Sequence, residues 1–126
     1  MENLNLNNRS YLNNIIIIEK SEEVYSATLD KIYYEYNNVI YIFNEPYQLI
    51  IRKKKGNDIP FWYCVEDEAY GISVMEDTIE EAVKSFYSWL DIVWNEYAME
   101  ADDKLGKKPK MIKNNLNKLI GEVIKL

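Results

Sequence analysis

Carboxylates are the only side chains in this sequence whose types and spacing could support catalysis. They gather as Glu66-Asp67-Glu68, as Glu76-Asp77 and as Asp102-Asp103. Two such groups facing each other across a cleft could act as acid and base, and a cluster could bind Mg²⁺ or Ca²⁺ through oxygen ligands. No pair is spaced in a way that identifies a cleft, and the spacing and the glycine of an EF-hand loop are both missing. We therefore expect a solvated acidic surface, with no bound metal and no cofactor.

The other residues that usually carry catalysis are absent or isolated. The sequence has no His and one Cys, which excludes Ser-His-Asp and Cys-His catalysis and a tetrahedral zinc site. Cys64 stands in a strand-like run and is expected to be buried and inert, because no basic residue is adjacent. The 4 glycines are scattered and form no phosphate-binding loop. These observations predict that the protein is not an enzyme.

Length and composition predict one folded domain over residues 1–126. Hydrophobic residues make up 48% of the chain and charged residues 29%, a balance that supports a buried core. No apolar run approaches the ~20 residues that a membrane span needs, and the N-terminus does not resemble a signal peptide. We expect a cytoplasmic protein without a membrane partner. Residues 1–10 are rich in Asn and are expected to be flexible.

Charge is distributed unevenly along the chain. Residues 1–103 carry a formal charge of −12, whereas residues 104–126 carry +6 within a net charge of −6. In one interpretation the basic C-terminal helical segment packs its apolar face on the acidic body and leaves its lysines in water. In the other the lysines bind nucleic-acid phosphates. The lysines concerned are Lys104, Lys107, Lys108, Lys110, Lys113 and Lys118.

The strongest helix signal runs from Thr78 to about Met99. Thr78 and Glu81 have the spacing of a capping box. The apolar positions that follow form one continuous stripe, at Ile79, Val83, Phe86, Leu90, Val93 and Tyr97. Three further aromatic residues fall largely outside it, namely Tyr87, Trp89 and Trp94. They are either covered by the C-terminal helix or exposed as a partner surface, where Trp and Tyr concentrate binding energy.

Four strand-like runs precede this helix. They cover Val39 to Phe43, Tyr47 to Arg52, Phe61 to Val65 and Tyr70 to Met75, after an earlier run from Tyr11 to Glu19. The breaks at residues 44–46, 56–58 and 67–68 are short, which is typical of an antiparallel meander. The sequence therefore predicts an α+β fold. It consists of a four- to five-stranded antiparallel sheet, a long amphipathic helix (about 78–99) and a C-terminal helix that begins at Pro109 (about 109–125).

Residues 21–36 allow two readings. A helix capped by Ser21 would place four residues on one face, namely Tyr25, Leu29, Ile32 and Tyr36. Alternatively, residues 31–36 pair with residues 39–43 as a hairpin about Asn37-Asn38, given the high strand propensity of Tyr and Ile. We prefer the helix.

The start of the long helix resembles a known family. The segment Glu76-Asp77-Thr78-Ile79-Glu80-Glu81-Ala82-Val83 follows a strand. It is similar to the Gly-Asp-Thr-x-Glu-Glu-Ala segment that HicB-like antitoxins commonly carry after a short antiparallel meander. The matching region covers residues 47–90, with Glu76 where the family usually has Gly. The resemblance implies stoichiometric neutralisation of a toxic ribonuclease by covering its basic active site.

Small size, acidity, the lack of catalytic residues and a composition typical of an AT-rich genome also suit a phage-encoded inhibitor of a bacterial defence system, such as an anti-CRISPR protein, or an immunity protein against a bacterial toxin. Both readings predict a non-enzymatic protein that binds a basic nuclease or nucleic-acid-handling effector, because acidic charge speeds encounter and aromatic anchors slow dissociation. The expected contact residues are Tyr87, Trp89, Trp94, Glu66, Asp67, Glu68, Asp102 and Asp103. The alternative is a nucleic-acid-binding or regulatory adaptor that acts through the basic helix, with a body that forms a homodimer or recruits another protein.

Overall fold

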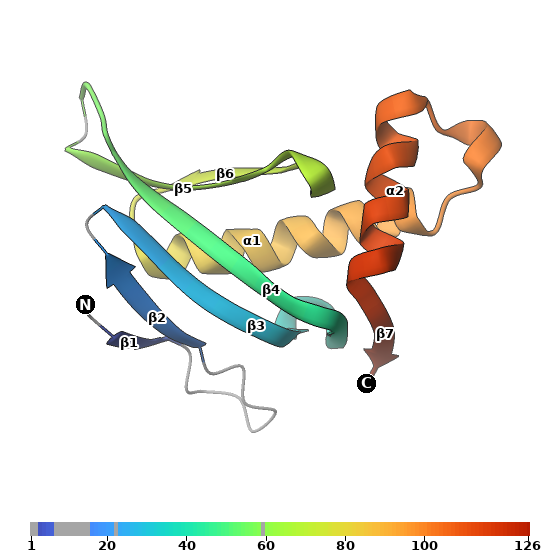
Figure 1. Ribbon diagram of the computed structural model, residues 1–126, viewed down its shortest axis with the longest axis horizontal. Coiled ribbons are helices and arrows are strands. Elements are labelled where there is room, and N and C mark those ends of the chain that lie inside the picture. The colour runs from blue at the N-terminus through green and yellow to red at the C-terminus, as the bar shows by residue number, and fades with distance from the viewer. Residues whose placement is uncertain (1–2, 7–15, 22, 59) are drawn as a thin grey trace.

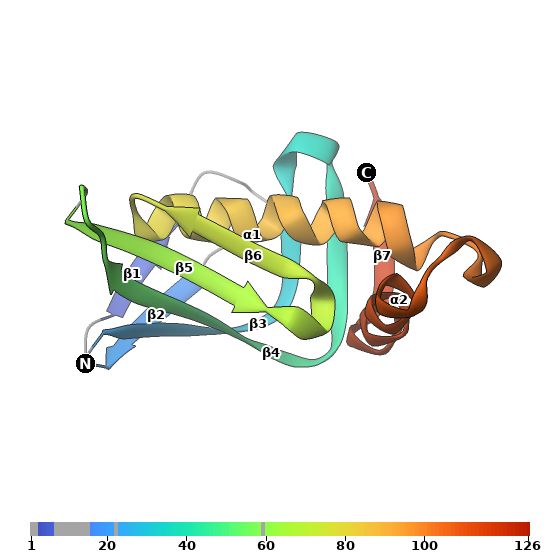
Figure 2. The same cartoon turned by 90° about the horizontal axis from the view of Figure 1, so that it is seen from above.

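The computed structural model describes residues 3–6, 16–21, 23–58 and 60–126 and has the predicted α+β fold. A seven-stranded antiparallel sheet forms one layer, and helix α1 (Ile79–Val93) lies across one of its faces (Figure 1). Helix α2 (Lys107–Leu119) stands at the far end of α1 (Figure 2). The strands are β1 (Asn3–Leu6), β2 (Ile16–Ser21), β3 (Val24–Tyr34), β4 (Val39–Lys55), β5 (Phe61–Asp67), β6 (Ile72–Glu76) and β7 (Ile120–Lys125).

The predicted antiparallel meander is confirmed in strands β4, β5 and β6, which are neighbours in the sheet in chain order, and β2 and β3 continue the same order on the other side of β4. The expected breaks at residues 56–58 and 67–68 are also present, the second as a 3-10 turn at Glu68–Tyr70. The turn expected at Asn44-Glu45-Pro46 is wrong, because β4 continues through it. The pairing of β3 with β4 shifts register at this point, between Leu29 and Lys31. Such an irregularity accommodates a proline, which has no N–H to give to a ladder.

The preferred helix over residues 21–36 is wrong, and the hairpin reading is confirmed. Lys31 pairs with Ile42, and Tyr34 pairs with Val39. Burial alternates with a period of two from Val24 to Leu29, which is the pattern of a strand with one covered face, and resumes at Ile32 after the register shift. At the end of the hairpin turn Asn38 has φ 53°, a left-handed conformation that Asn adopts more readily than most residues.

Helix α1 follows the sequence prediction closely. The side chain of Thr78 caps its first turn, since Thr78 Oγ1 accepts a hydrogen bond from the backbone N–H of Glu81 at 3.1 Å. A π-helical turn at Trp94–Ala98 extends the helix to the predicted end. The apolar stripe faces the sheet: Val83, Phe86, Leu90 and Val93 are buried, and Ile79 and Tyr97 pack against the core.

The hydrophobic core lies between α1 and the covered face of the sheet. Phe86 of α1 stacks on Tyr47 of β4 with ring centroids 5.4 Å apart, and Tyr70 meets Tyr47 edge-on at 5.9 Å. Leu49 and Leu90 are fully buried. Burial of a large apolar side chain stabilises a fold by about 1.5–3 kcal/mol. This packing fixes α1 on the sheet and thereby positions the last turns of the helix.

The C-terminal helix is confirmed, but it ends earlier than expected. After Leu119 the chain becomes strand β7, which pairs antiparallel with β4 from Val39↔Lys125 to Phe43↔Ile120. Gly121 lies at this junction, where an added Cβ atom would meet the side-chain oxygen of Asn44 at 2.1 Å. The close approach requires a residue without a side chain. The apolar face of α2 packs on the body through Ile112, Leu116 and Leu119.

The sequence predicts that residues 1–10 are flexible and that no segment spans a membrane. Within residues 1–10, Asn3–Leu6 form strand β1 paired with β2, and the other residues of that segment lie outside the described residues, as do residues 11–15. In the described part of the chain no helix has the length and apolar character that crossing a membrane would require.

Candidate functional site

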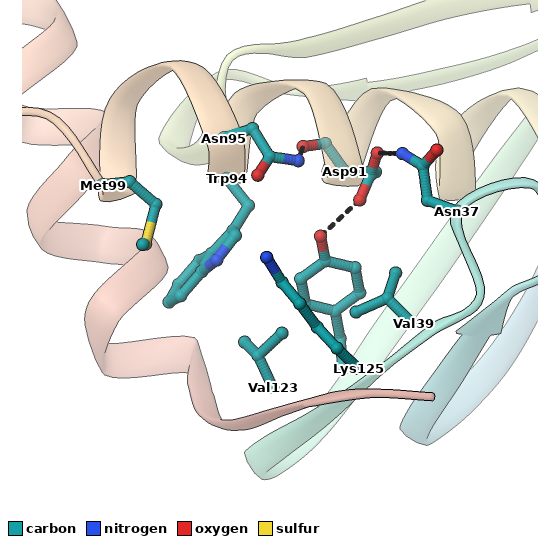
Figure 3. Close-up of a pocket in the computed structure, with 9 residues that line it drawn as sticks. Asn37, Val39, Asp91, Trp94, Asn95, Met99, Val123 and Lys125 are labelled. Atoms are coloured by element: carbon teal, nitrogen blue, oxygen red, sulfur yellow. Dashed lines mark hydrogen bonds between the residues drawn. The ribbon is translucent and has the colours of Figure 1, made fainter.

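A pocket of about 570 Å³ opens where the end of α1, the first residues of β4 and strand β7 meet (Figure 3). This volume lies within the ~300–1,000 Å³ that is usual for small-molecule sites. The pocket therefore forms only when the β3–β4 hairpin, the end of α1 and strand β7 are all in place. Its lining residues are Asn37, Val39, Tyr41, Asp91, Trp94, Asn95, Met99, Val123 and Lys125.

A buried carboxylate lies in the wall of this pocket. Asp91 is 4% exposed and is the one buried charged residue among those that the structure describes. Its two carboxylate oxygens accept hydrogen bonds from the Tyr41 hydroxyl and from the Asn37 side-chain amide (Figure 3). The side-chain amide of Asn95 donates to the backbone oxygen of Asp91 at 2.8 Å. Both side-chain donors to Asp91 among the described residues are neutral, and no ion pair of those residues includes it.

Two aromatic rings form the walls beside Asp91. Tyr41 and Trp94 lie edge to face, with ring centroids 6.1 Å apart and an interplanar angle of 70°. Burial, and secondarily the hydrogen bond to Asp91, raises the pKa of the Tyr41 phenol far above its usual range. Tyr41 therefore remains a neutral hydrogen-bond donor at physiological pH. Apolar side chains of Val39, Met99 and Val123 complete the walls.

Among the residues that the structure describes, Lys125 is the one cationic residue that lines the pocket. It belongs to β7, and its side chain is exposed and extends into the pocket (Figure 3). It forms no ion pair with Asp91 in the described residues. The pocket thus has a negative group in its wall and a positive group at its mouth.

The structure separates the three aromatic residues that the sequence singled out on α1. Trp89 is 39% exposed, and Trp94 lines the pocket. Tyr87 is buried against Phe86, with ring centroids 6.1 Å apart, so the expected exposure of Tyr87 is wrong. The reason is its position four residues after Val83 and three before Leu90, which places it at the edge of the buried stripe.

The acidic residues at the end of β5 are mostly engaged within the protein. Tyr47 donates to Asp67 at 2.6 Å, and Asp67 also caps the 3-10 turn, so it has a structural role. Glu66 forms an ion pair with Lys54 at 2.8 Å, which lowers the pKa of Glu66 and raises that of Lys54. Glu68 is exposed. The predicted solvated surface is thus confirmed for Glu66 and Glu68, which are exposed, and not for the half-buried Asp67.

The second acidic cluster follows the end of α1. Asp102 forms an ion pair with Lys113 at 2.8 Å, which lowers the pKa of Asp102, whereas Asp103 is exposed. Lys113 also donates to the backbone oxygen of Glu100 at 2.6 Å and so ties α2 to this loop. Throughout the described ranges, no group of three or more acidic or Cys residues is arranged to hold a metal ion.

Most of the other C-terminal lysines face solvent. Lys107, Lys110 and Lys118 line an open groove of about 580 Å³ on α2 together with Met111, Asn114 and Asn115. Lys104 and Lys108 are exposed outside this groove. The packing of α2 agrees with the interpretation in which the tail packs its apolar face on the body and leaves its lysines in water.

Sequence reasoning missed three features of this region. Ile92 is 38% exposed and lies three residues after Trp89, so the two share one helix face. The contacts of Asn37 and Tyr41 with Asp91 were also missed. One local signal was available, because Asp91 interrupts the apolar run between Leu90 and Val93.

Comparison of the chain with protein-family models, with curated proteins and with solved structures finds no match in any of the three. The resemblance of residues 47–90 to HicB-like antitoxins therefore stays a prediction.

Proposed function

We propose that this protein is a non-enzymatic inhibitor that binds and neutralises a basic, nucleic-acid-handling protein in the cytoplasm. The target would be a toxin nuclease or a bacterial defence effector such as a CRISPR effector. The observation that carries the proposal is the pair Trp89 and Ile92, two large apolar side chains that remain exposed on α1 although its opposite face already fills the core. Exposed apolar and aromatic residues on a rigid helix are typical anchors of protein interfaces.

Charge around this pair supports the same proposal. Glu96 is exposed and lies four residues after Ile92, on the neighbouring turn of the helix. Asp103 is exposed in the loop that follows the helix. A basic nuclease surface would be attracted to such an acidic rim, and it would lose access to nucleic-acid phosphates once covered. Trp89 would then slow dissociation.

Capture and inhibition test the proposal together. The wild-type protein, the double variant Trp89→Ala/Ile92→Ser and the control Met75→Ser are each tagged and used to purify partners from a bacterial host. Met75 is a suitable control because it is 54% exposed but belongs to β6. We expect a stoichiometric basic nuclease with the wild type and the control, inhibited in the complex, and at least ~10-fold weaker binding by the double variant. Equal binding by all three proteins, or an uninhibited nuclease, would contradict the proposal.

The groove on α2 supports a second candidate function, a nucleic-acid-binding or regulatory adaptor. Its lysines are on one side of a single helix, and none of Lys107, Lys110 and Lys118 forms an ion pair among the described residues. Fluorescence anisotropy with labelled DNA and RNA between about 50 and 200 mM salt would reveal nucleic-acid binding through lysines. The logarithm of the association constant then falls by ~0.7–0.9 per neutralised phosphate for each decade of salt. Lys110→Gln/Lys118→Gln should reduce the slope, whereas Lys84→Gln on α1 should not.

A further inference from the structure

We infer that the pocket beside Asp91 binds an organic cation, a guanidinium or a primary ammonium group. A small molecule or an Arg or Lys side chain of a partner protein could carry this group. The inference concerns the pocket alone and does not depend on the proposed inhibitor function.

The first argument is the charge of the pocket wall. A buried carboxylate is costly unless a cation or several hydrogen bonds compensate its charge. Asp91 has two neutral side-chain donors and no ion-pair partner in the described residues. A carboxylate has about four acceptor positions, so each oxygen can take a further donor. A cation that enters the pocket would supply both the missing charge and those donors.

The second argument is the chemistry of the other walls. Tyr41 and Trp94 both line the pocket, with ring planes at 70°; Tyr41 is buried and Trp94 is half-buried, so Trp94 offers the more accessible ring. Aromatic faces attract a cation within about 6 Å of the ring centroid, and the attraction is larger where water is excluded. Met99 adds a polarisable side chain. A neutral ligand of the same shape would gain only the apolar contacts.

The third argument is a fixed acceptor that favours a group with several N–H donors. The side-chain amide nitrogen of Asn95 is held by the backbone oxygen of Asp91. This hydrogen bond leaves the amide oxygen of Asn95 directed into the pocket (Figure 3). A guanidinium group has five N–H donors in a planar fork and could reach the carboxylate and this oxygen together.

Lys125 makes the inference more specific. It is the like-charged residue at the mouth, so a cation must enter against its repulsion. Removing its charge should therefore tighten the binding of a cation, whereas it should weaken the binding of an anion. The Lys125→Gln variant thus distinguishes the two ligand classes by the direction of the change.

Two probes of equal shape test the site by NMR. Propylguanidinium is titrated into the ¹⁵N-labelled protein, with the neutral propylurea as the matched ligand. We expect saturable shifts of the Trp94 indole N–H, assigned with Trp94→Phe, and at least ~10-fold weaker binding of propylurea. The Asp91→Asn substitution should weaken the binding of propylguanidinium by at least ~10-fold, and Lys125→Gln should tighten this binding. Propylammonium in a parallel titration determines whether the primary amine or the guanidinium is preferred.

Several results would overturn the inference. Equal binding of propylurea, unchanged binding in Asp91→Asn or weaker binding in Lys125→Gln would each do so. If Asp91→Asn does not fold, the comparison of the two ligands on the wild type and the Lys125→Gln titration remain decisive. A competition experiment tests the source of the cation: release of a captured partner by propylguanidinium would assign the cation to a side chain of that partner, and retention would exclude that partner as the source.

Discussion

The hydroxyl of Tyr41 donates to the carboxylate of Asp91, which lies 50 positions later in the chain. Tyr41 belongs to β4 and Asp91 to α1, so this hydrogen bond joins the sheet to the helix that covers it. Asn37, in the turn between β3 and β4, binds the other carboxylate oxygen. The same contacts hold the last turns of α1 in place and form the wall of the pocket. Stability and ligand binding therefore depend on one group, and variants must be chosen to separate them.

The first prediction concerns the stability that this contact provides. Tyr41→Phe removes the donor and leaves the buried Asp91 carboxylate with one side-chain partner. We expect the free energy of unfolding to fall by about 1–3 kcal/mol, as is usual when a buried charged group loses a hydrogen bond. Tyr36→Phe is the control, because its side chain is 86% exposed, and it should change stability by less than ~0.5 kcal/mol. Urea unfolding measures the free energy of unfolding of both variants. Equal losses would show that the hydrogen bond from Tyr41 to Asp91 adds no particular stability.

The second prediction concerns alkaline pH. Burial, together with the hydrogen bond to Asp67, raises the pKa of Tyr47 well above its usual range. In the unfolded chain the phenol ionises near pH 10, so its contribution is fully present below about pH 10 and is lost as the pH rises further. Tyr41 adds to this loss for the same reason.

Urea unfolding between pH 8 and 11 should show this fall, with a limiting slope near 1.4 kcal/mol per pH unit for each such tyrosine. Tyr47→Phe should reduce the slope, and Tyr36→Phe, at a side chain that is 86% exposed, is the matched control. A slope that is the same in the wild type and in Tyr47→Phe would show that Tyr47 ionises freely in the folded protein.

Local patterns were enough to predict α1 but not strand β3. The Thr78 cap and the apolar period of α1 lie within one helix, so the sequence contains the whole signal. Tyr25, Leu29 and Ile32 have a spacing that suits a helix face, yet they are buried in β3. The spacing 25, 27, 29 also fits a strand, because Ala27 is buried as well. Pairing with β4, which no local pattern reveals, decides between the two.

Features that depend on contacts between distant segments could not be predicted from spacing. Strand β7 forms because residues 120–125 find an open edge of β4, although the same residues continue the periodicity of a helix. The pocket combines the turn at Asn37, the strand residue Tyr41 and the helix residue Asp91. Exposed acids were predictable as a class. The internal role of Asp67 was not, because its partner Tyr47 is 20 positions away.

The third prediction separates folding from binding on α1. Leu90 is fully buried, so Leu90→Ala should lower the free energy of unfolding by about 2–5 kcal/mol. Ile92 is two residues later and 38% exposed, so Ile92→Ala should cost less than ~1.5 kcal/mol. Partner binding by the folded protein should show the reverse order, with the larger loss in Ile92→Ala. Chemical denaturation and binding titrations on the two variants measure both orders. A partner affinity unaffected by Ile92→Ala would remove this face of α1 from the interface.

The fourth prediction concerns the contact between the β5–β6 connection and α2. Gly71 has φ 66°, and a Cβ atom added there would lie 2.8 Å from Cδ1 of Ile112 on α2. Gly71→Ala therefore combines a left-handed conformation, which costs about 1–2 kcal/mol for a residue with a side chain, with a steric clash. Gly106→Ala is the control: its backbone φ is negative, and the nearest atom to its Cβ is 3.9 Å away on Pro109.

A double-mutant cycle separates the two causes. Ile112→Val removes the Cδ1 atom that the new methyl group would meet, so Gly71→Ala should cost less in the Ile112→Val background than in the wild type. A residual cost of about 1–2 kcal/mol should remain, because the backbone conformation is unchanged. Urea unfolding of the four proteins gives the coupling energy. Additive costs would mean that α2 moves away without loss, and hence that Ile112 does not fix the distance between α2 and the turn.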